Sequence, residues 1–207
     1  MGKVMVDISL SLDGYITGPN DEGGRLHAWV FGGEPDGRLP PGHYPQATVD
    51  ADILAELFTS TGAVVMGRRT FDLHEEAWGD NPPFHVPCFV LTHRRMETLV
   101  KDGGTTFTFV TEGIEPMLAQ AQAVTGEKQI YVLGGASLAD QCLQAGLLDE
   151  LRLHLVPVLL GNGIRLFEHL ENAPLELEAP EVISSPCVTH LRFRVRKRER
   201  TSQDRLE

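Results

Sequence analysis

Residues 64–71 run Val-Val-Met-Gly-Arg-Arg-Thr-Phe, so an apolar strand passes directly into the start of a helix. Gly67 allows a ligand to approach the backbone closely, and the first helical turn offers unpaired N–H groups at the positive end of the helix dipole. Arg68 and Arg69 place two guanidiniums beside these donors, a combination that suits a phosphate ester. An arginine pair at a helix start is also compatible with simple solvation. The junction predicts a strand–loop–helix unit with an anion site at its turn.

Two later segments have the same form. Residues 89–95 end an apolar strand in Thr92, His93 and Arg94, which offer a hydroxyl, an imidazole and a guanidinium. Residues 130–138 lead from an apolar strand through Gly134-Gly135 into a helix. Each segment alone is also compatible with an ordinary polar loop. Three such junctions at the carboxyl ends of strands are what a dinucleotide site requires.

Segments with strand character alternate with segments of helical spacing along most of the chain. Strands are predicted at 3–10, 63–66, 86–91, 105–110, 129–133 and 150–156, helices at 50–59, 70–78, 115–124 and 137–145, and late extended segments at 175–178 and 188–195. This order predicts a three-layer α/β/α fold with a mixed, mostly parallel central sheet and antiparallel strands at the C-terminal end. We expect one domain over residues 1–198 and a polar tail over 199–207.

The segment from 17 to 49 is rich in glycine and proline and has no clear periodicity. Its length favours a functional loop or lid. An irregular covering in which aromatic residues such as Trp29 form a plug is the alternative.

Composition limits the partners. The net charge of −11 argues against nucleic acid and anionic membranes, and no apolar run approaches the roughly 20 residues of a membrane-spanning helix. Because the chain starts with a strand pattern, we expect no signal peptide and a cytoplasmic location. Three widely spaced cysteines and scattered histidines predict neither a disulfide framework nor a metal site. The arginines that alternate from Arg192 onward are expected on a solvated strand face.

In order along the chain, these motifs resemble the dihydrofolate reductase superfamily, and within it the C-terminal reductase domain of bifunctional riboflavin-biosynthesis proteins. The matching segments are 9–14 (Ser-Leu-Ser-Leu-Asp-Gly), 66–71 (Met-Gly-Arg-Arg-Thr-Phe), 91–94 (Leu-Thr-His-Arg), 133–135 (Leu-Gly-Gly) and 156–163 with Leu166-Phe167. The last of these favours the riboflavin-type branch.

The resemblance implies that NADPH binds across the strand ends. Arg68, Arg69, Thr70, Thr92, His93 and Arg94 would hold the adenosine half and its extra phosphate, and the stretch from Gly134 to Leu138 would take the pyrophosphate and approach the nicotinamide. The full set of implied cofactor-binding residues is Gly14, Ile16, Gly67, Arg68, Arg69, Thr70, Leu91, Thr92, His93, Arg94, Gly134, Gly135, Ala136, Ser137 and Leu138. The resemblance also implies a cis peptide bond between Gly134 and Gly135.

Two carboxylates are candidates for the catalytic role. Asp52 opens the helix before Met66, close to where dihydrofolate reductases place the acid that holds the pterin, and Asp50 is its near neighbour. Asp13 follows the first strand, in the loop that would border the nicotinamide. We favour Asp52, with Asp13 as the alternative, although an aspartate at a helix start is an ordinary cap and Asp-Gly an ordinary turn.

The function predicted is therefore an NADPH-dependent reductase of a small heterocycle, similar to 5-amino-6-(5-phosphoribosylamino)uracil reductase. A dihydrofolate reductase and a non-catalytic NADP-binding module are the alternatives. The chain has no H-x-E followed by P-C-x-x-C, so the deaminase half of the bifunctional proteins is missing. The resemblance also implies a homodimer.

Overall fold

The computed structural model describes residues 2–20, 23–30, 49–168, 170 and 175–196. They form a nine-stranded sheet in the order β10-β11-β8-β1-β7-β3-β4-β6-β5 and a separate two-stranded sheet of β2 and β9. The strands are β1 (Val4–Ser11), β2 (Tyr15–Thr17), β3 (Thr61–Gly67), β4 (Pro87–Leu91), β5 (Leu99–Val100), β6 (Thr106–Val110), β7 (Gln129–Val132), β8 (Glu150–Val156), β9 (Ile164–Arg165), β10 (Glu181–Ser184) and β11 (Thr189–Arg194).

The central strands are parallel, and antiparallel pairs occur at both ends of the sheet. β8, β1, β7, β3, β4 and β6 pair in parallel, whereas β11 is antiparallel to β8, β10 to β11, and β5 to β6. The predicted fold class is confirmed, including the antiparallel C-terminal strands. Residues 175–178 form no named strand, but they lie beside the end of β11: Leu177 forms an isolated antiparallel bridge with Val195, and the N–H of Glu178 donates to the carbonyl of Arg194 at 3.0 Å.

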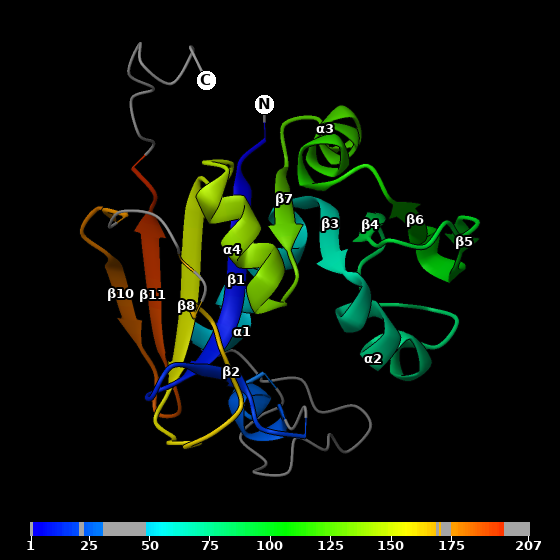
Figure 1. Cartoon of the computed structure of the whole chain (residues 1–207). Helices are drawn as coiled ribbons and strands as arrows, with labels where there is room; N and C mark the ends of the chain where they lie inside the picture. The colour runs from blue at the N-terminus through cyan, green and yellow to red at the C-terminus, as the bar shows by residue number, and fades with distance from the viewer. Residues whose placement is uncertain (1, 21–22, 31–48, 169, 171–174, 197–207) are drawn as a thin grey trace.

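Four α-helices cover the two faces of the sheet (Figure 1). They are α1 (Val49–Ser60), α2 (Arg68–Trp78), α3 (Ile114–Thr125) and α4 (Ala136–Gln144), and η1 (Gly24–His27) and η2 (Asp102–Gly104) are short 3-10 helices. Side chains of α3 and α4 join one core cluster, and side chains of α1 and α2 join another on the opposite face. In Figure 1, α4 lies in front of β1 and α1 behind it.

Because β1 is covered on both faces, both sets of its alternating side chains are buried. Val4, Val6 and Leu10 pack in the α3/α4 core. Met5, Asp7 and Ser9 are also buried, on the α1/α2 face. The polar residues Asp7 and Ser9 of this strand therefore lie inside the molecule.

Arg192 corrects the expected solvated arginine face. It lies on β11, and its guanidinium donates to both carboxylate oxygens of Glu56 on α1 at 2.8 and 2.9 Å. Arg152 on β8 donates to the same Glu56 at 3.0 Å. The alternating arginines thus begin with an ion-pair network that joins α1 to the sheet, while Arg194 and Arg196 are exposed.

Of the regions singled out in the sequence, one lies outside the described residues and another is only partly described. The predicted tail over 199–207 lies outside the described residues, as do 21–22 and 31–48 of the glycine- and proline-rich segment. Within the described part of that segment, Trp29 is buried and belongs to a small core cluster with Leu26, Val156 and Val188. Across the described residues, no helix is long and apolar enough to span a membrane.

Candidate functional site

The three predicted junctions lie side by side, because β7, β3 and β4 are neighbours in the sheet. Val65 pairs with Val132, and Gly67 pairs with Leu91, so the carboxyl ends of these parallel strands meet at one edge. A cavity of about 980 Å³ opens there, near the upper end of the usual size range for ligand sites. Of the fifteen implied cofactor-binding residues, all except Gly14 line this cavity.

The first junction joins β3 to α2 through Gly67, whose backbone is extended (φ −78°, ψ 157°). A Cβ built on Gly67 would meet no heavy atom of the described structure within 4 Å, so the cavity reaches the bare backbone. No described side chain caps α2, which leaves its first N–H groups directed toward the same space. The junction thus combines close backbone approach with a positive dipole end.

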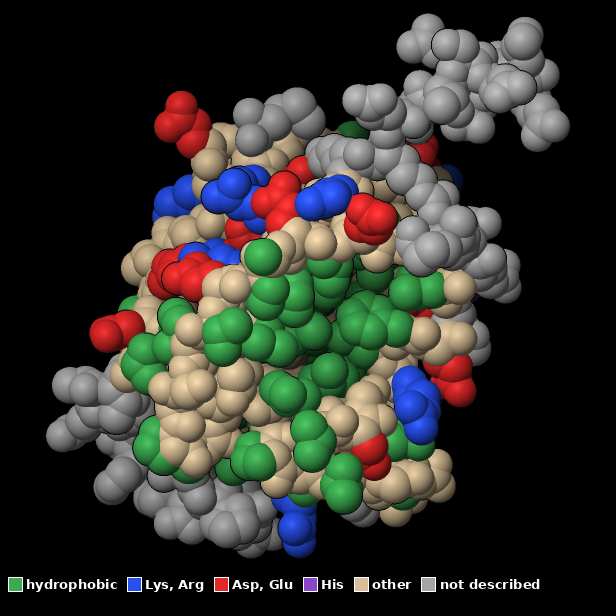
Figure 2. Space-filling model, turned by 90° about the vertical axis from the view of Figure 1, so that its left-hand side faces the viewer, with side chains coloured by type: hydrophobic (Ala, Val, Ile, Leu, Met, Phe, Trp, Pro, Cys, Tyr) green, Lys and Arg blue, Asp and Glu red, His purple; other side chains and the backbone are tan. Residues whose placement is uncertain are grey.

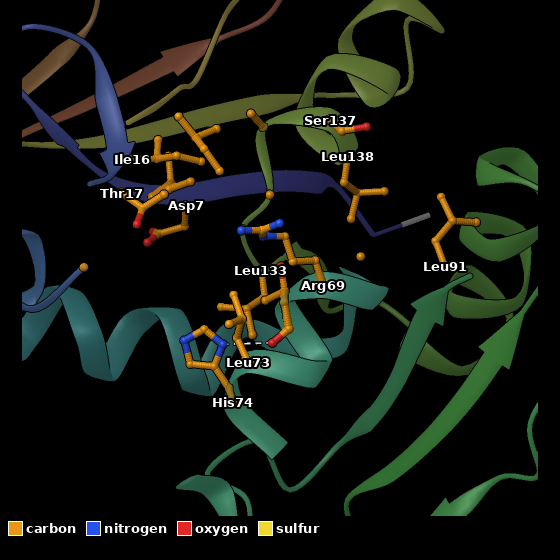
Figure 3. Close-up of a pocket in the computed structure, with 18 of the residues that line it drawn as sticks. Asp7, Ile16, Thr17, Arg69, Leu73, His74, Leu91, Leu133, Ser137 and Leu138 are labelled. Atoms are coloured by element: carbon orange, nitrogen blue, oxygen red, sulfur yellow. Dashed lines mark hydrogen bonds between the residues drawn. The ribbon is translucent and has the colours of Figure 1, made fainter. Parts of the chain in front are cut away.

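The arginines of this junction have different surroundings. Arg68 Nε donates to Asp72 Oδ1 at 2.6 Å, one helical turn later, and its guanidinium lies 5.8 Å from the rings of Phe71 and Phe109. Arg69 reaches into the cavity from α2, together with Leu73 and His74 (Figure 3). Arg68 is therefore held in place by its neighbours, whereas Arg69 forms part of the cavity wall.

The second junction is a tight polar turn after β4. Thr92 is buried, and its Oγ1 accepts a hydrogen bond from the backbone N–H of Arg94 at 3.1 Å. His93 and Arg94 are exposed and line the cavity. The buried threonine thus fixes a turn that presents an imidazole and a guanidinium to the cavity.

The third junction passes from β7 to α4 through Gly134 and Gly135, whose φ angles are 62° and 86°. Positive φ angles favour glycine. A Cβ on Gly135 would lie 3.5 Å from Thr70 Oγ1, so the first and third junctions touch. The implied cis bond is wrong: the described residues contain no cis peptide, and two successive positive φ angles turn the chain with trans bonds.

Asp13 lies outside the cavity lining and organises the loop after β1. Its carboxylate accepts hydrogen bonds from Ser11 Oγ at 2.7 Å and from the N–H groups of Gly161 and Leu160 at 2.7 and 3.1 Å. Desolvation opposes ionisation, but these three donors prevail and lower the pKa of Asp13 to about 2. Such a carboxyl group remains ionised at neutral pH, which does not suit a proton donor.

Asp52 is exposed on α1 and does not line the cavity. Helical geometry is the reason, since residues two apart lie about 200° apart around a helix axis. Asp50, Ile53 and Leu57 form the buried face of α1. The helix that was expected to direct Asp52 toward a substrate therefore directs Asp50 inward instead.

The end of the cavity next to β1 contains ionisable residues that sequence reasoning missed. Asp7 and His154 line it beside Ser9 and Trp29, and Figure 3 shows Asp7 next to Ile16 and Thr17. Trp29 Nε1 donates to Ser9 Oγ at 2.9 Å and its ring centroid lies 4.5 Å from that of His154. The available signal was an ionisable residue within an apolar strand pattern, Asp7 in β1 and His154 in β8.

Fold and site together define an α/β domain with a nucleotide-sized cavity at the carboxyl edge of a mostly parallel sheet. The chain belongs to the RibD C-terminal domain family, whose sequence profile matches residues 2–191. Its relatives include the uncharacterized protein YyaP of Bacillus subtilis, 26% identical over 176 residues that cover 80% of each chain.

Solved structures share the fold. A putative riboflavin biosynthesis protein from Shewanella sp. PV-4 has a TM-score of 0.68 at 24% identity, covering 94% of this chain and 99% of that one. Dihydrofolate reductase from Enterococcus faecalis, complexed with NADP(H), has a TM-score of 0.55 at 16% identity, covering 94% of this chain and 96% of that one. At these identities the likeness concerns the fold alone.

Proposed function

We propose that the chain is an NADPH-dependent reductase of a small heterocycle, similar to 5-amino-6-(5-phosphoribosylamino)uracil reductase. The observation that carries this proposal is the convergence of three strand-end junctions, from the adjacent strands β7, β3 and β4, on one cavity. The family and the NADP(H) named with the dihydrofolate reductase of the same fold support the choice of cofactor.

The residues present fit this cofactor. Gly67 leaves open space where a side chain would stand, and the first turns of α2 and α4 line the cavity. Arg68, Arg69 and Arg94 place positive charge beside them in a chain whose net charge is −11. Anionic groups bind at such helix starts and arginines. We infer that the first two junctions hold the adenosine half with its extra phosphate and that the α4 start holds the pyrophosphate.

The two ends of the cavity would then have different roles, one holding the cofactor and the other the substrate. When bound, the cofactor supplies a hydride, and the protein's contribution is to orient the reactants and to exclude water. Beyond the three junctions, the cavity is lined by Trp29, Leu54, Leu57 and Phe58, with Asp7 and His154 among them. A mostly apolar wall with few polar groups suits a flat heterocycle.

NADPH oxidation, followed by absorbance, tests the proposal against dihydrofolate and a panel of riboflavin-pathway pyrimidines. We expect turnover of a pyrimidine and a marked loss of NADPH affinity in Arg68→Ala. Turnover of dihydrofolate alone would instead identify a dihydrofolate reductase. Tight NADPH binding without turnover of any compound would support a non-catalytic module, and equal affinity for NADPH and NADH would overturn the arginine assignment.

We also propose a homodimer. On the α4 side of the β8–β10 end of the sheet, Leu155, Leu191 and Phe193 are only partly buried and Val182 is 56% exposed. Figure 2 shows hydrophobic side chains gathered on this side of the molecule. Contiguous apolar patches on a protein surface usually mark interaction sites. Sedimentation equilibrium of the parent chain and of Val182→Glu would test this face, with a monomeric variant expected.

We also propose that residues 1–198 form a single domain and that the protein is cytoplasmic. All three cysteines are free thiols, and Cys187 is exposed. Free thiols are typical of a reducing compartment.

A further inference from the structure

Four ionisable side chains from four different elements form a continuous hydrogen-bonded chain on the α1 face of the sheet. Asp7 Oδ1 on β1 lies 2.7 Å from His154 Nε2 on β8. His154 Nδ1 lies 2.7 Å from His190 Nδ1 on β11, and His190 Nε2 lies 3.0 Å from Asp50 Oδ1 at the start of α1. The relative exposures are 6% for Asp7, 3% for His154, 5% for His190 and 8% for Asp50, so the four side chains are buried and Asp50 is the most accessible of them to solvent.

The two ends of this hydrogen-bonded series, Asp7 and Asp50, have different surroundings. Asp7 lines the cavity, and its second oxygen, Oδ2, is buried without a hydrogen-bond partner among the described residues. Asp50 and His190 do not line the cavity. A buried carboxylate oxygen without a partner is costly, because water no longer solvates it. The observation points to a polar ligand group that would form a hydrogen bond with Asp7 Oδ2 in the cavity.

The distances fix the number of protons. Two imidazole nitrogens at 2.7 Å must share one proton, since two lone pairs or two N–H groups would repel. One proton also lies in each of the two contacts between an imidazole and a carboxylate. With Asp7 ionised, the four groups therefore hold three protons and one net negative charge, and a fourth proton on Asp7 Oδ2 makes them neutral. A shift of each proton along its own hydrogen bond transfers one acidic proton from the Asp50 end to the Asp7 end.

We propose that Asp7 is the proton donor of the reduction and that His154, His190 and Asp50 form a buried relay that recharges it. This inference rests on the proposed function. It specifies the substrate class as a heterocycle or imine with a C=N bond whose nitrogen, or a group conjugated to it, faces Asp7. Asp7 is the catalytic residue, and the other three are positioning residues that supply its proton.

The balance of the step is as follows. The substrate carbon gains a hydride with its electron pair from the bound cofactor, which leaves oxidised, and the C=N π bond breaks. The substrate nitrogen gains the proton of the Asp7 Oδ2–H group, and Asp7 becomes a carboxylate. A solvent proton enters at Asp50, the three shared protons each move one position, and Asp7 is protonated again at Oδ1, the oxygen that faces His154. Rotation of the Asp7 carboxyl group about its Cβ–Cγ bond then brings this proton to the Oδ2 position, from which it is donated. The sum consumes one reduced cofactor, one substrate and one solvent proton.

The groups around the relay favour a neutral His190. Burial lowers the pKa of His190, against the hydrogen bond from Asp50, which acts in the opposite direction. Tyr131 on β7 donates to the main-chain carbonyl of Asp7 at 3.4 Å, and burial followed by the charge of Asp7 raises the pKa of Tyr131 well above its ordinary value, so it stays neutral. Trp29 packs against both imidazoles.

The charges nearest to the relay on the same face are already paired. Arg152, two residues before His154, donates to Glu150 at 2.6 Å and to Glu56 at 3.0 Å, and Arg192, two residues after His190, bonds to Glu56. The remaining titratable residues of the cavity wall, from η1, α2, the β4 loop and the region around β9, are His27, Arg68, Arg69, Asp72, His74, His93, Arg94, Arg165 and Glu168.

Nitrogen-15 NMR of the histidine rings tests the relay in the cofactor-free chain. We expect His154 and His190 to be complementary at Nδ1, one protonated and the other not, and to titrate together. Asp50→Asn should change the ring-nitrogen shifts of His154, which Asp50 does not touch, because the shared protons couple them. Independent titration of the two rings, with His154 unaffected by Asp50→Asn, would overturn the relay.

Kinetics test the donor. Asp7→Asn keeps an oxygen for His154 but removes the acid, so we expect turnover to fall by about 10²–10⁴-fold with NADPH affinity unchanged. His190→Gln, outside the cavity lining, should lower turnover by about tenfold or more without changing KM and should increase the solvent isotope effect. His85→Gln, also outside the cavity lining, is the matched control and should match the parent.

The two proposals fail in distinguishable ways. A parent chain that does not bind NADPH overturns the proposed function, and with it the donor role, whatever the ring spectra show. A parent chain that binds NADPH and reduces a substrate, together with an Asp7→Asn variant that is folded and equally fast, overturns the donor role alone.

Discussion

The two ends of the cavity are built in different ways. At the end where we propose that the cofactor binds, called the cofactor end below, each junction is a continuous stretch of sequence in which a strand, a glycine or threonine turn and the next element follow one another, as in residues 64–71. At the β1 end, Asp7, Asp50, His154 and His190 come from positions up to 183 residues apart, as their numbers 7 and 190 show. Local chemistry can be recognised along a sequence, whereas a site assembled by sheet pairing requires the strand order.

The largest effect is expected at the cofactor end, from the double variant Arg68→Ala/Arg69→Ala. Hydrogen bonds to charged groups contribute about 1.5–3 kcal/mol each, so the loss of two should weaken NADPH binding by about 100-fold or more. NADH, which lacks the extra phosphate, should bind almost as before. Titration calorimetry with both cofactors measures the difference, and Asp72→Asn controls for the ion pair of Arg68. An equal loss for both cofactors would contradict the assignment.

Gly67→Ala is the next test of that end. The added methyl group meets no described protein atom, so the fold should be preserved, but it occupies space next to the first turn of α2. We expect a rise in the NADPH dissociation constant of about tenfold, or ~1.4 kcal/mol. Gly79→Ala, at the other end of α2 and outside the cavity, is the comparison, although its φ of 60° adds backbone strain there. Unchanged NADPH affinity in Gly67→Ala would show that the cofactor does not approach this backbone.

We expect the free energy of unfolding to depend on pH through His190, beside the β1 end of the cavity. Burial lowers the folded-state pKa of His190, so below the unfolded value of 6.5 the unfolded chain binds a proton that the folded chain does not. The contribution of neutral His190 to the free energy of unfolding is therefore complete above pH 6.5. It is lost as the pH drops, by up to about 1.4 kcal/mol per pH unit, until the folded-state pKa is reached. Urea unfolding at several pH values measures this slope. His190→Gln should flatten it, and an equally steep slope in that variant would place the titration elsewhere.

The smallest effect is expected for Asp52→Asn. The side chain is exposed and outside the cavity lining, so stability should change by no more than about 0.5 kcal/mol and turnover should stay at the parent rate. Asp13→Asn should lower the melting temperature more than Asp52→Asn, because it weakens the acceptor for three donors of the loop. A large loss of turnover in Asp52→Asn alone would show that Asp52 takes part in the reaction.

The fold was largely predictable, since the strands and helices of the central sheet have clear periods and their starts were marked by glycine or an acidic first turn. The short strands β2, β5, β9 and β10 were missed because two to four residues carry little periodicity. Arg192 was misread for another reason: its partner Glu56 lies on a helix 136 residues earlier, and no local pattern reveals that pairing.

For the site, the three junctions predicted from the sequence do meet at one cavity, whereas the two favoured carboxylates, Asp52 and Asp13, do not line it. Gly67, Thr92 and Gly135 could be recognised because a turn after an apolar strand is a local feature. Asp52 was preferred to Asp50 because the family resemblance placed the acid only to within about a residue. Asp7 was not singled out, because the sequence alone does not show that β1 lies between β7 and β8 with helices packed on both of its faces.

The most direct measurement is a crystal structure of the chain with NADPH. We predict the pyrophosphate at the first turn of α4 beside Gly135, the extra phosphate near Arg68 and Arg69, and the nicotinamide directed toward the Asp7 end of the cavity. A cofactor bound away from β7, β3 and β4, or a cavity that stays empty at saturating NADPH, would contradict the proposed function at its foundation.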